Sequence, residues 1–248
     1  MKNQYIGDVG DYGKYGLLRF LAQKGVKIGV NWYLTEGEDN FGKDRDYLKR
    51  EDKFRPYDPN LFEAMKDLQS EPNVALVKEL QIIPNAIYFE DALNTDELPA
   101  KERKAERARR HAKALAELIS AELVFADPDV GTLRKKMSVS CNGAEHYADL
   151  HELADHYFHG QDVVYYCHKA FRTDEAWRRK KREFLTFDQK LKLDAHLFVL
   201  TYSRGMQRSY VFVVHPGRAE EYRAYIDEFL AGPWGRGDNA PFWEDADL

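Results

Sequence analysis

The segment Leu123-Val124-Phe125-Ala126-Asp127-Pro128-Asp129-Val130 decides the fold prediction for this chain of 248 residues. Its four leading apolar residues predict a buried strand, and that strand ends at two carboxylates. Because ligands bind at the carboxyl ends of strands in open α/β sheets, Asp127 and Asp129 are candidate site residues. Pro128 fixes its own φ and disfavours helix at the preceding residue, so we expect both carboxylates on a stiff turn. The alternative is a helix N-cap and a turn aspartate, which are common after strands.

Outward from this strand, the hydrophobic pattern alternates strands with helices. Further strands are predicted at 26–34, 86–89 and 163–166, followed by a hairpin of 195–202 and 209–214 that turns at Gly205. Helices are predicted at 14–24, 60–69, 74–80, 99–121, 144–158, 174–187 and 219–230. The sequence therefore predicts one three-layer, Rossmann-like α/β domain over residues 1–248. Its sheet is expected to be mostly parallel, with a C-terminal antiparallel hairpin.

The composition is typical of a soluble globular protein. Hydrophobic residues make up 44% of the chain, charged residues make up 32%, and the net charge is −5. We find no apolar run of membrane-spanning length and no signal-peptide pattern. Cys141 and Cys167 lack metal-ligand spacing, so we expect reduced thiols. These features predict a cytoplasmic protein and leave its oligomeric state open.

A glycine-rich segment, Gly7-Asp8-Val9-Gly10-Asp11-Tyr12-Gly13-Lys14, precedes the first predicted helix. Glycine allows a backbone to approach a ligand closely, and a helix N-terminus favours an anion. The segment lacks the Gly-Lys-Ser/Thr ending of a P-loop. We therefore expect a ligand-contacting loop that carries Asp8, Asp11, Tyr12 and Lys14. A plain glycine-rich turn is the alternative.

Polar residues also follow two other predicted strands. Glu36 and Asn40 come after the strand at 26–34, and His168 and Arg172 come after the strand at 163–166. If the strands are parallel, these residues meet the Asp127 turn at one edge of the sheet. Charged groups crowded together perturb one another's pKa and mark a candidate site. His168 alone would more often be a structural histidine.

Three basic segments are candidates for binding phosphates. Arg134, Lys135 and Lys136 follow the Asp127 turn, and a second run comprises Arg178, Arg179, Lys180, Lys181 and Arg182. Local basic segments on an acidic protein can form a nucleic-acid-binding face. The third segment, 101–113, contains interspersed glutamates, and a solvated helix face explains it better.

These motifs together resemble an uncharacterised family of bacterial proteins. The matching parts are Asp11 to Arg19, Trp32 to Leu34, Asp127 to Gly131 with Val130 in place of Asn, and His168 with Arg172. That family implies no reaction. More distantly, Asp11, Lys14 and Asp127-Pro128 resemble the opening and the catalytic pair of the large-subunit ribosomal RNA adenine-N6 methyltransferases. This chain departs from them in its cofactor loop and at Val130, so the resemblance implies the fold without the S-adenosylmethionine site.

A two-carboxylate turn beside a nucleic-acid-binding face favours hydrolysis. The leading hypothesis is a DNA glycosylase, a cofactor-independent hydrolase that excises a plain or modified base. A role in defence against foreign DNA would fit this activity, but no residue specifies it. Asp127 or Asp129 would activate water and stabilise an oxocarbenium ion, and Lys14 and His168 would balance their charge. The expected substrate contacts are Asp8, Asp11, Tyr12, Glu36, Asn40 and Arg172.

An enzyme that acts on an extruded base also needs a pocket to receive it. The aromatic candidates for lining such a pocket are Tyr12, Tyr15, Trp32, Tyr33 and Phe41, for which core packing is the alternative. Other functions also remain open. They are an S-adenosylmethionine-dependent base methyltransferase, a nuclease whose carboxylates hold Mg²⁺, and a non-catalytic nucleic-acid-binding module.

Overall fold

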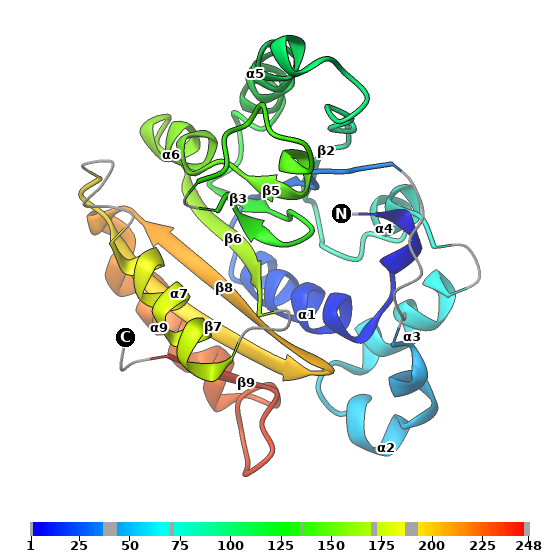
Figure 1. Ribbon diagram of the computed structural model, residues 1–248. Helices are drawn as coiled ribbons and strands as arrows, with labels where there is room; N and C mark the ends of the chain where they lie inside the picture. Colours follow the sequence, from blue (N-terminus) through cyan, green and yellow to red (C-terminus); the bar gives the residue numbers. More distant parts are fainter. Residues whose placement is uncertain are drawn as a thin grey trace.

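The computed structural model describes residues 2–36, 44–69, 72–134, 136–169, 173–186 and 193–245, except for the side chains of 181–185. A seven-stranded mixed sheet forms its centre, in the order β2-β1-β3-β6-β8-β7-β9 (Figure 1). The parallel strands are β1 (Ile28–Asn31), β2 (Ile87–Phe89), β3 (Leu123–Ala126) and β6 (Asp162–His168). The antiparallel strands are β7 (His196–Arg204), β8 (Met206–Val214) and β9 (Phe242–Glu244).

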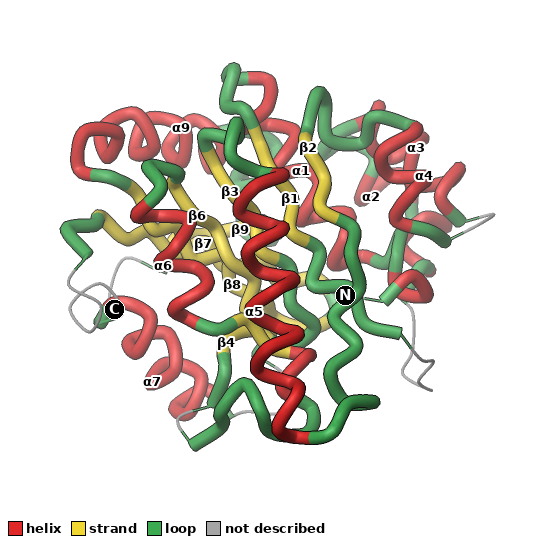
Figure 2. The backbone as a smooth tube through the Cα atoms, turned by 90° about the horizontal axis from the view of Figure 1, so that it is seen from above, coloured by secondary structure: helices red, strands yellow, loops and turns green. Residues whose placement is uncertain are grey.

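Helices cover both faces of the sheet and complete three layers (Figure 2). One face packs against α1 (Val9–Gln23), α3 (Pro59–Leu68), α4 (Val74–Glu79) and α9 (Ala219–Ala231). The other face packs against α5 (Ala100–Glu117), α6 (Leu150–Phe158) and α7 (Asp174–Leu185). Side chains of β3 alternate between the two faces, as the period of a strand requires: Phe125 contacts the α1 side, whereas Ala126 contacts the α6 side. The predicted α/β class, parallel core and antiparallel hairpin are confirmed.

Short elements complete the described chain. They are helix α2 (Glu51–Phe54), the 3-10 helices Asn3–Tyr5, Asp46–Lys49, Ala144–His146 and Pro216–Arg218, and the paired strands β4 (Gly131–Thr132) and β5 (Tyr147–Ala148).

Among the described residues, no helix has both the length and the apolar character needed to cross a membrane. Cys141 is exposed, Cys167 is buried, and both are free thiols.

Two predicted helix starts are wrong for a local reason, and one strand was missed. Helix α1 begins at Val9, because the Asp8 side chain caps it by accepting from the Asp11 amide at 2.8 Å. Helix α6 begins at Leu150, because Asp149 and Glu152 form a capping box and Tyr147–Ala148 pairs with β4. Strand β9 was not predicted, because its three residues have no clear strand pattern and form a strand only by pairing with β7.

The buried His156 in α6 predicts a loss of stability in acid. Its Nδ1 lies 2.8 Å from Gln161 Oε1, and burial lowers its pKa to about 4. The unfolded chain takes up this proton below its ordinary value of 6.5, whereas the folded chain stays neutral until about 4. Lowering the pH from 7.5 to 5 should therefore cost about 2 kcal/mol of unfolding free energy through this residue. His156→Asn should remove that part of the pH dependence in urea titrations, and parallel wild-type and variant pH profiles would contradict the assignment.

Candidate functional site

The ends of β1, β3 and β6 meet the N-terminus of α1 at one edge of the sheet (Figure 1). Helix α1 leads directly into β1 and runs back along the sheet, so its first turn lies where the parallel strands end. The Asp127 amide donates to the Asn31 carbonyl at 2.9 Å, and the His168 amide donates to the Val130 carbonyl at 2.9 Å. The ends of β1, β3 and β6 therefore converge as predicted, whereas residues 37–43 and 170–172 of the following loops lie outside the described part of the chain.

Asp11, Lys14 and Asp127 form a buried triad of charges at this edge. Lys14 Nζ lies 2.7 Å from Asp11 Oδ1 and 2.7 Å from Asp127 Oδ2, and none of the three side chains is more than 5% exposed. The rings of Tyr15, Trp32 and Tyr166 surround the ammonium group, with centroids 5.7–5.9 Å from Nζ. The triad thus joins the start of α1 to the end of β3 in the buried interior.

Burial raises the pKa values of the two triad carboxylates, although they share one ammonium that acts in the opposite direction. Burial raises the pKa of Asp11 to about 6, against the opposing effect of Lys14, and the neighbouring Asp8 and Asp127 raise it further. Burial likewise raises the pKa of Asp127. Burial alone would lower the pKa of Lys14, but the two carboxylates raise it above its ordinary value. Lys14 therefore remains a cation, and the Asp127 side chain, 3% exposed, is closed off from the surface.

Asp129 differs from Asp127 in being partly accessible. Its side chain is 17% exposed, and Oδ2 accepts from Thr35 Oγ1 at 3.0 Å and lies 2.8 Å from His146 Nδ1. The hydrogen bond to Asp129 raises the pKa of His146. Among the described residues, Thr35 and His146 orient a carboxylate that still reaches the surface at the end of β3, which makes Asp129 the better candidate for chemistry.

All but the first of the glycines at the start of the chain serve helix packing, whereas Gly7 lies before the helix with a φ of 86°. Gly10, Gly13 and Gly16 lie within α1, spaced three residues apart. A Cβ atom at these positions would come within 2.3–2.5 Å of Arg208, Tyr202 and Trp234, respectively. The absence of side chains therefore lets α1 pack directly against residues of β7, β8 and the C-terminal segment.

Gly13→Ala should destabilise the protein even though alanine favours helix. The new Cβ would lie 2.5 Å from the ring of Tyr202, which is fully buried and donates its hydroxyl to the Val9 carbonyl at 2.9 Å. Overpacking of this kind costs about 1–3 kcal/mol. Thermal and urea unfolding would measure the loss. The control is Gly217→Ala, where a Cβ meets nothing within 4 Å, and an equal effect of both substitutions would refute the packing argument.

The other predicted site residues differ in how far they are buried. Tyr12 is a correction: it is fully buried among aromatic rings and donates its hydroxyl to the Phe54 carbonyl at 2.8 Å, so it belongs to the core. Asp8 is the N-cap of α1, and its Oδ2 lies 3.9 Å from Arg208 Nη2. Glu36 is exposed and His168 is half-buried at the end of β6. Asn40 and Arg172 lie outside the described residues.

The basic segments after β4 and β6 are largely solvent-facing. Arg134, Lys136, Arg178 and Arg179 are exposed, and Lys180 is half-buried. Arg134 also donates to the Tyr147 hydroxyl at 2.6 Å, and Arg179 forms an ion pair with Glu175 at 3.4 Å. Lys135 and the side chains of Lys181 and Arg182 lie outside the described part of the chain.

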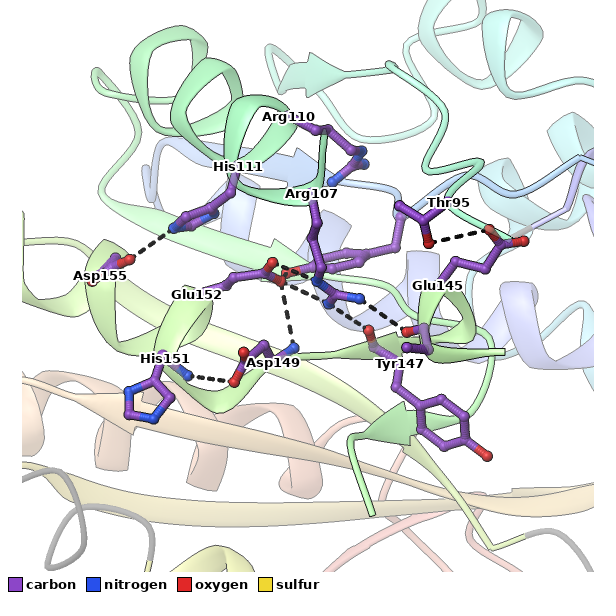
Figure 3. A network of polar contacts seen from close by, with 12 residues as sticks. Thr95, Arg107, Arg110, His111, Glu145, Tyr147, Asp149, His151, Glu152 and Asp155 are labelled. Atoms are coloured by element: carbon purple, nitrogen blue, oxygen red, sulfur yellow. Dashed lines mark hydrogen bonds and ion pairs between the residues drawn. The ribbon is translucent and has the colours of Figure 1, made fainter. Parts of the chain in front are cut away.

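A second buried network holds the segment that carries His146 (Figure 3). Arg107 of α5 donates to both oxygens of Glu152, at 2.6 and 2.9 Å, and to the carbonyls of Ala144 and Tyr147, at 2.9 and 2.7 Å. Tyr33 donates its hydroxyl to Glu152 at 2.9 Å. Because Arg107 and Arg110 are only 2–3% exposed, the prediction of a wholly solvated helix face at 101–113 is wrong for this side of α5.

Thr35, His146 and Arg208 are site residues that the sequence reasoning missed. His146 fell inside a helix predicted at 144–158. The Asp149 and Glu152 spacing of a capping box is a sequence signal that places the helix start after His146. For Thr35 and Arg208 we find no such local signal.

Comparison with protein-family models and with curated proteins finds no match for this chain. Function must therefore be argued from the site itself.

Proposed function

We propose that this protein is a hydrolase that acts on DNA and removes a base, with Asp129 as the carboxylate beside the reacting sugar. The observation that carries the proposal is the state of Asp129. It is partly exposed at the end of β3, and Thr35 and His146 orient it. It lies two positions after Asp127, which belongs to the buried triad. Carboxylates at the ends of central strands lie where α/β proteins bind ligands.

The chemistry follows from what a fixed carboxylate can do. Breaking the bond between a base and its sugar develops positive charge on the sugar, and water then attacks the anomeric carbon. A carboxylate held in place stabilises that charge and positions the water without first having to reorganise. In this proposal Asp127 and Lys14 position the turn that bears Asp129, and they do not contact the substrate.

The exposed cations support a DNA substrate. Arg134 and Lys136 follow β4, and Arg178 and Arg179 lie on α7, which follows the end of β6. The first segment follows the turn that bears Asp129 by way of β4, which pairs with β5, and the second follows the end of β6 (Figure 1). Cations of this kind neutralise backbone phosphates without reading sequence.

The aromatic residues do not supply a base pocket in this structure. Tyr12, Tyr15, Trp32 and Tyr33 are at most 1% exposed and belong to the core, and Phe41 lies outside the described residues. The proposal therefore assigns no stacking partner to the base.

Product analysis tests the proposal. Purified protein would be incubated with plain, methylated and glucosylated-hydroxymethylated DNA, and the products would be identified by mass spectrometry. We expect free base and alkali-labile sites without S-adenosylmethionine or added Mg²⁺. Methyl transfer, strand cleavage that requires Mg²⁺, or no product from any DNA would each overturn it, in favour of a methyltransferase, a nuclease or a binding module.

A further inference from the structure

Asp96, Glu145 and His146 form a cluster outside the buried triad, and of its members only His146, which contacts Asp129, has a part in the proposed hydrolysis. One potential ligand atom from each side chain lies within 4.8 Å of the other two. Ligands of one ion at 2.0–2.2 Å are at most about 4.4 Å apart, so small side-chain adjustments would bring these three atoms onto one ion. We propose that the cluster binds one divalent transition-metal ion.

The charge of the cluster calls for a cation. Glu145 is only 7% exposed, and its Oε2 accepts from the Asp96 amide at 2.8 Å. Thr95 Oγ1 also donates to Glu145 Oε2 at 3.4 Å, and neither Asp96 nor Glu145 forms an ion pair with a lysine or arginine among the described residues. A buried carboxylate without a countercharge is costly, and coordination of a metal ion removes that cost.

The ring of His146 is held as a metal-bound histidine would be. Its Nδ1 lies 2.8 Å from Asp129 Oδ2, so Nε2 is the nitrogen left for an ion. A carboxylate on the second ring nitrogen commonly orients a metal-ligating histidine and fixes its tautomer. Asp129 lies outside the cluster, so this contact supports metal binding independently of the two acidic residues.

The backbone around the cluster is fixed from outside. Arg107 donates to the carbonyls of Ala144 and Tyr147, which flank Glu145 and His146 (Figure 3). Both carboxylate oxygens of Asp96 accept from the Gly143 amide, at 2.9 and 2.7 Å. The backbone that carries the ligands is therefore already in place before an ion binds. Three protein ligands would leave further coordination positions for water.

The ligand chemistry selects among metals. A mixed set of one imidazole and two carboxylates suits Mn²⁺, Fe²⁺ or Zn²⁺, whereas Mg²⁺ and Ca²⁺ favour oxygen ligands alone. An ion in this position would fix the His146 ring, and through it the orientation of Asp129. The inference itself stands on the cluster and does not depend on base removal.

Titration with Mn²⁺ tests the inference, with free Mn²⁺ followed by electron paramagnetic resonance. We expect one ion per chain, displaced by Zn²⁺ far more readily than by Mg²⁺. Glu145→Gln should weaken binding by at least about tenfold. Glu97→Gln makes the same chemical change on an exposed neighbour and should not alter the affinity.

Folding of Glu145→Gln must be checked by circular dichroism, because Glu145 also accepts the Asp96 amide. Asp96→Asn, at a more accessible ligand, is the second variant and should weaken binding in the same way. Absence of stoichiometric binding, unchanged affinity in both variants, or equal displacement by Mg²⁺ would overturn the inference. Because the readout is binding, failure of the DNA assay would leave it standing.

Discussion

Replacing Lys14 with methionine should lower the free energy of unfolding by about 3–5 kcal/mol, the cost of breaking a buried ion pair by removing one partner. Methionine fills a similar volume but leaves Asp11 and Asp127 facing each other without the cation, which lies 2.7 Å from both. Each carboxylate would have to take up a proton or draw in water. Urea denaturation of the purified variant at neutral pH measures the loss.

Two further variants separate charge from packing. Lys49→Met removes an exposed lysine paired with Asp46, and it should leave stability unchanged. The triple variant Asp11→Asn, Lys14→Met, Asp127→Asn removes all three charges, and it should be more stable than Lys14→Met alone. If Lys14→Met had the same free energy of unfolding as the wild type, the ion pairs of the triad would not stabilise this edge of the sheet.

Replacing Asp129 with asparagine should reduce base release by about 10²–10⁴-fold. Asparagine keeps the size and one oxygen acceptor for Thr35, but it lacks the negative charge that would stabilise the sugar cation. The side chain is 17% exposed, in contrast to the 3% of Asp127, so the unfolding midpoint should change little. Initial rates on the DNA that yields product would be compared at saturating protein.

Asp238→Asn is the matched control, since it makes the same chemical change at an exposed position of the C-terminal segment. Its rate should equal that of the wild type. Full activity of Asp129→Asn would remove the carboxylate from the reaction and with it the proposed mechanism. A lost rate together with a large stability loss would instead make Asp129 a structural residue.

Much of the fold was predictable because its signals are local. The run Leu123–Ala126 has the apolar character of a central strand, and the structure places it between β1 and β6. The hairpin of β7 and β8 turns at Gly205, whose φ of 66° suits glycine. Strand β9 was missed because three residues have no strong pattern of their own, and their pairing with β7 is a long-range contact.

The candidate site was predictable only in outline. Lys14 and Asp127 were both candidates, and they do meet, although 113 residues separate them. Their roles could not be predicted, because burial of a charge depends on which side chains surround it. His146 was missed because the helix predicted at 144–158 included it, and its contact with Asp129 across 17 residues appears only in the folded chain.

The α/β class, the parallel core with its hairpin, and the acidic residues at the ends of the strands follow from the amino-acid pattern alone. Hydrophobic period, capping residues and strand-end carboxylates are local properties, and these set the elements and their order. The burial of Tyr12 in the core, the ion pair of Asp127 with Lys14, and the partial exposure of Asp129 depend on how the chain packs. Accessibility and ion pairing depend on distances between segments far apart in the chain, and packing alone sets those distances.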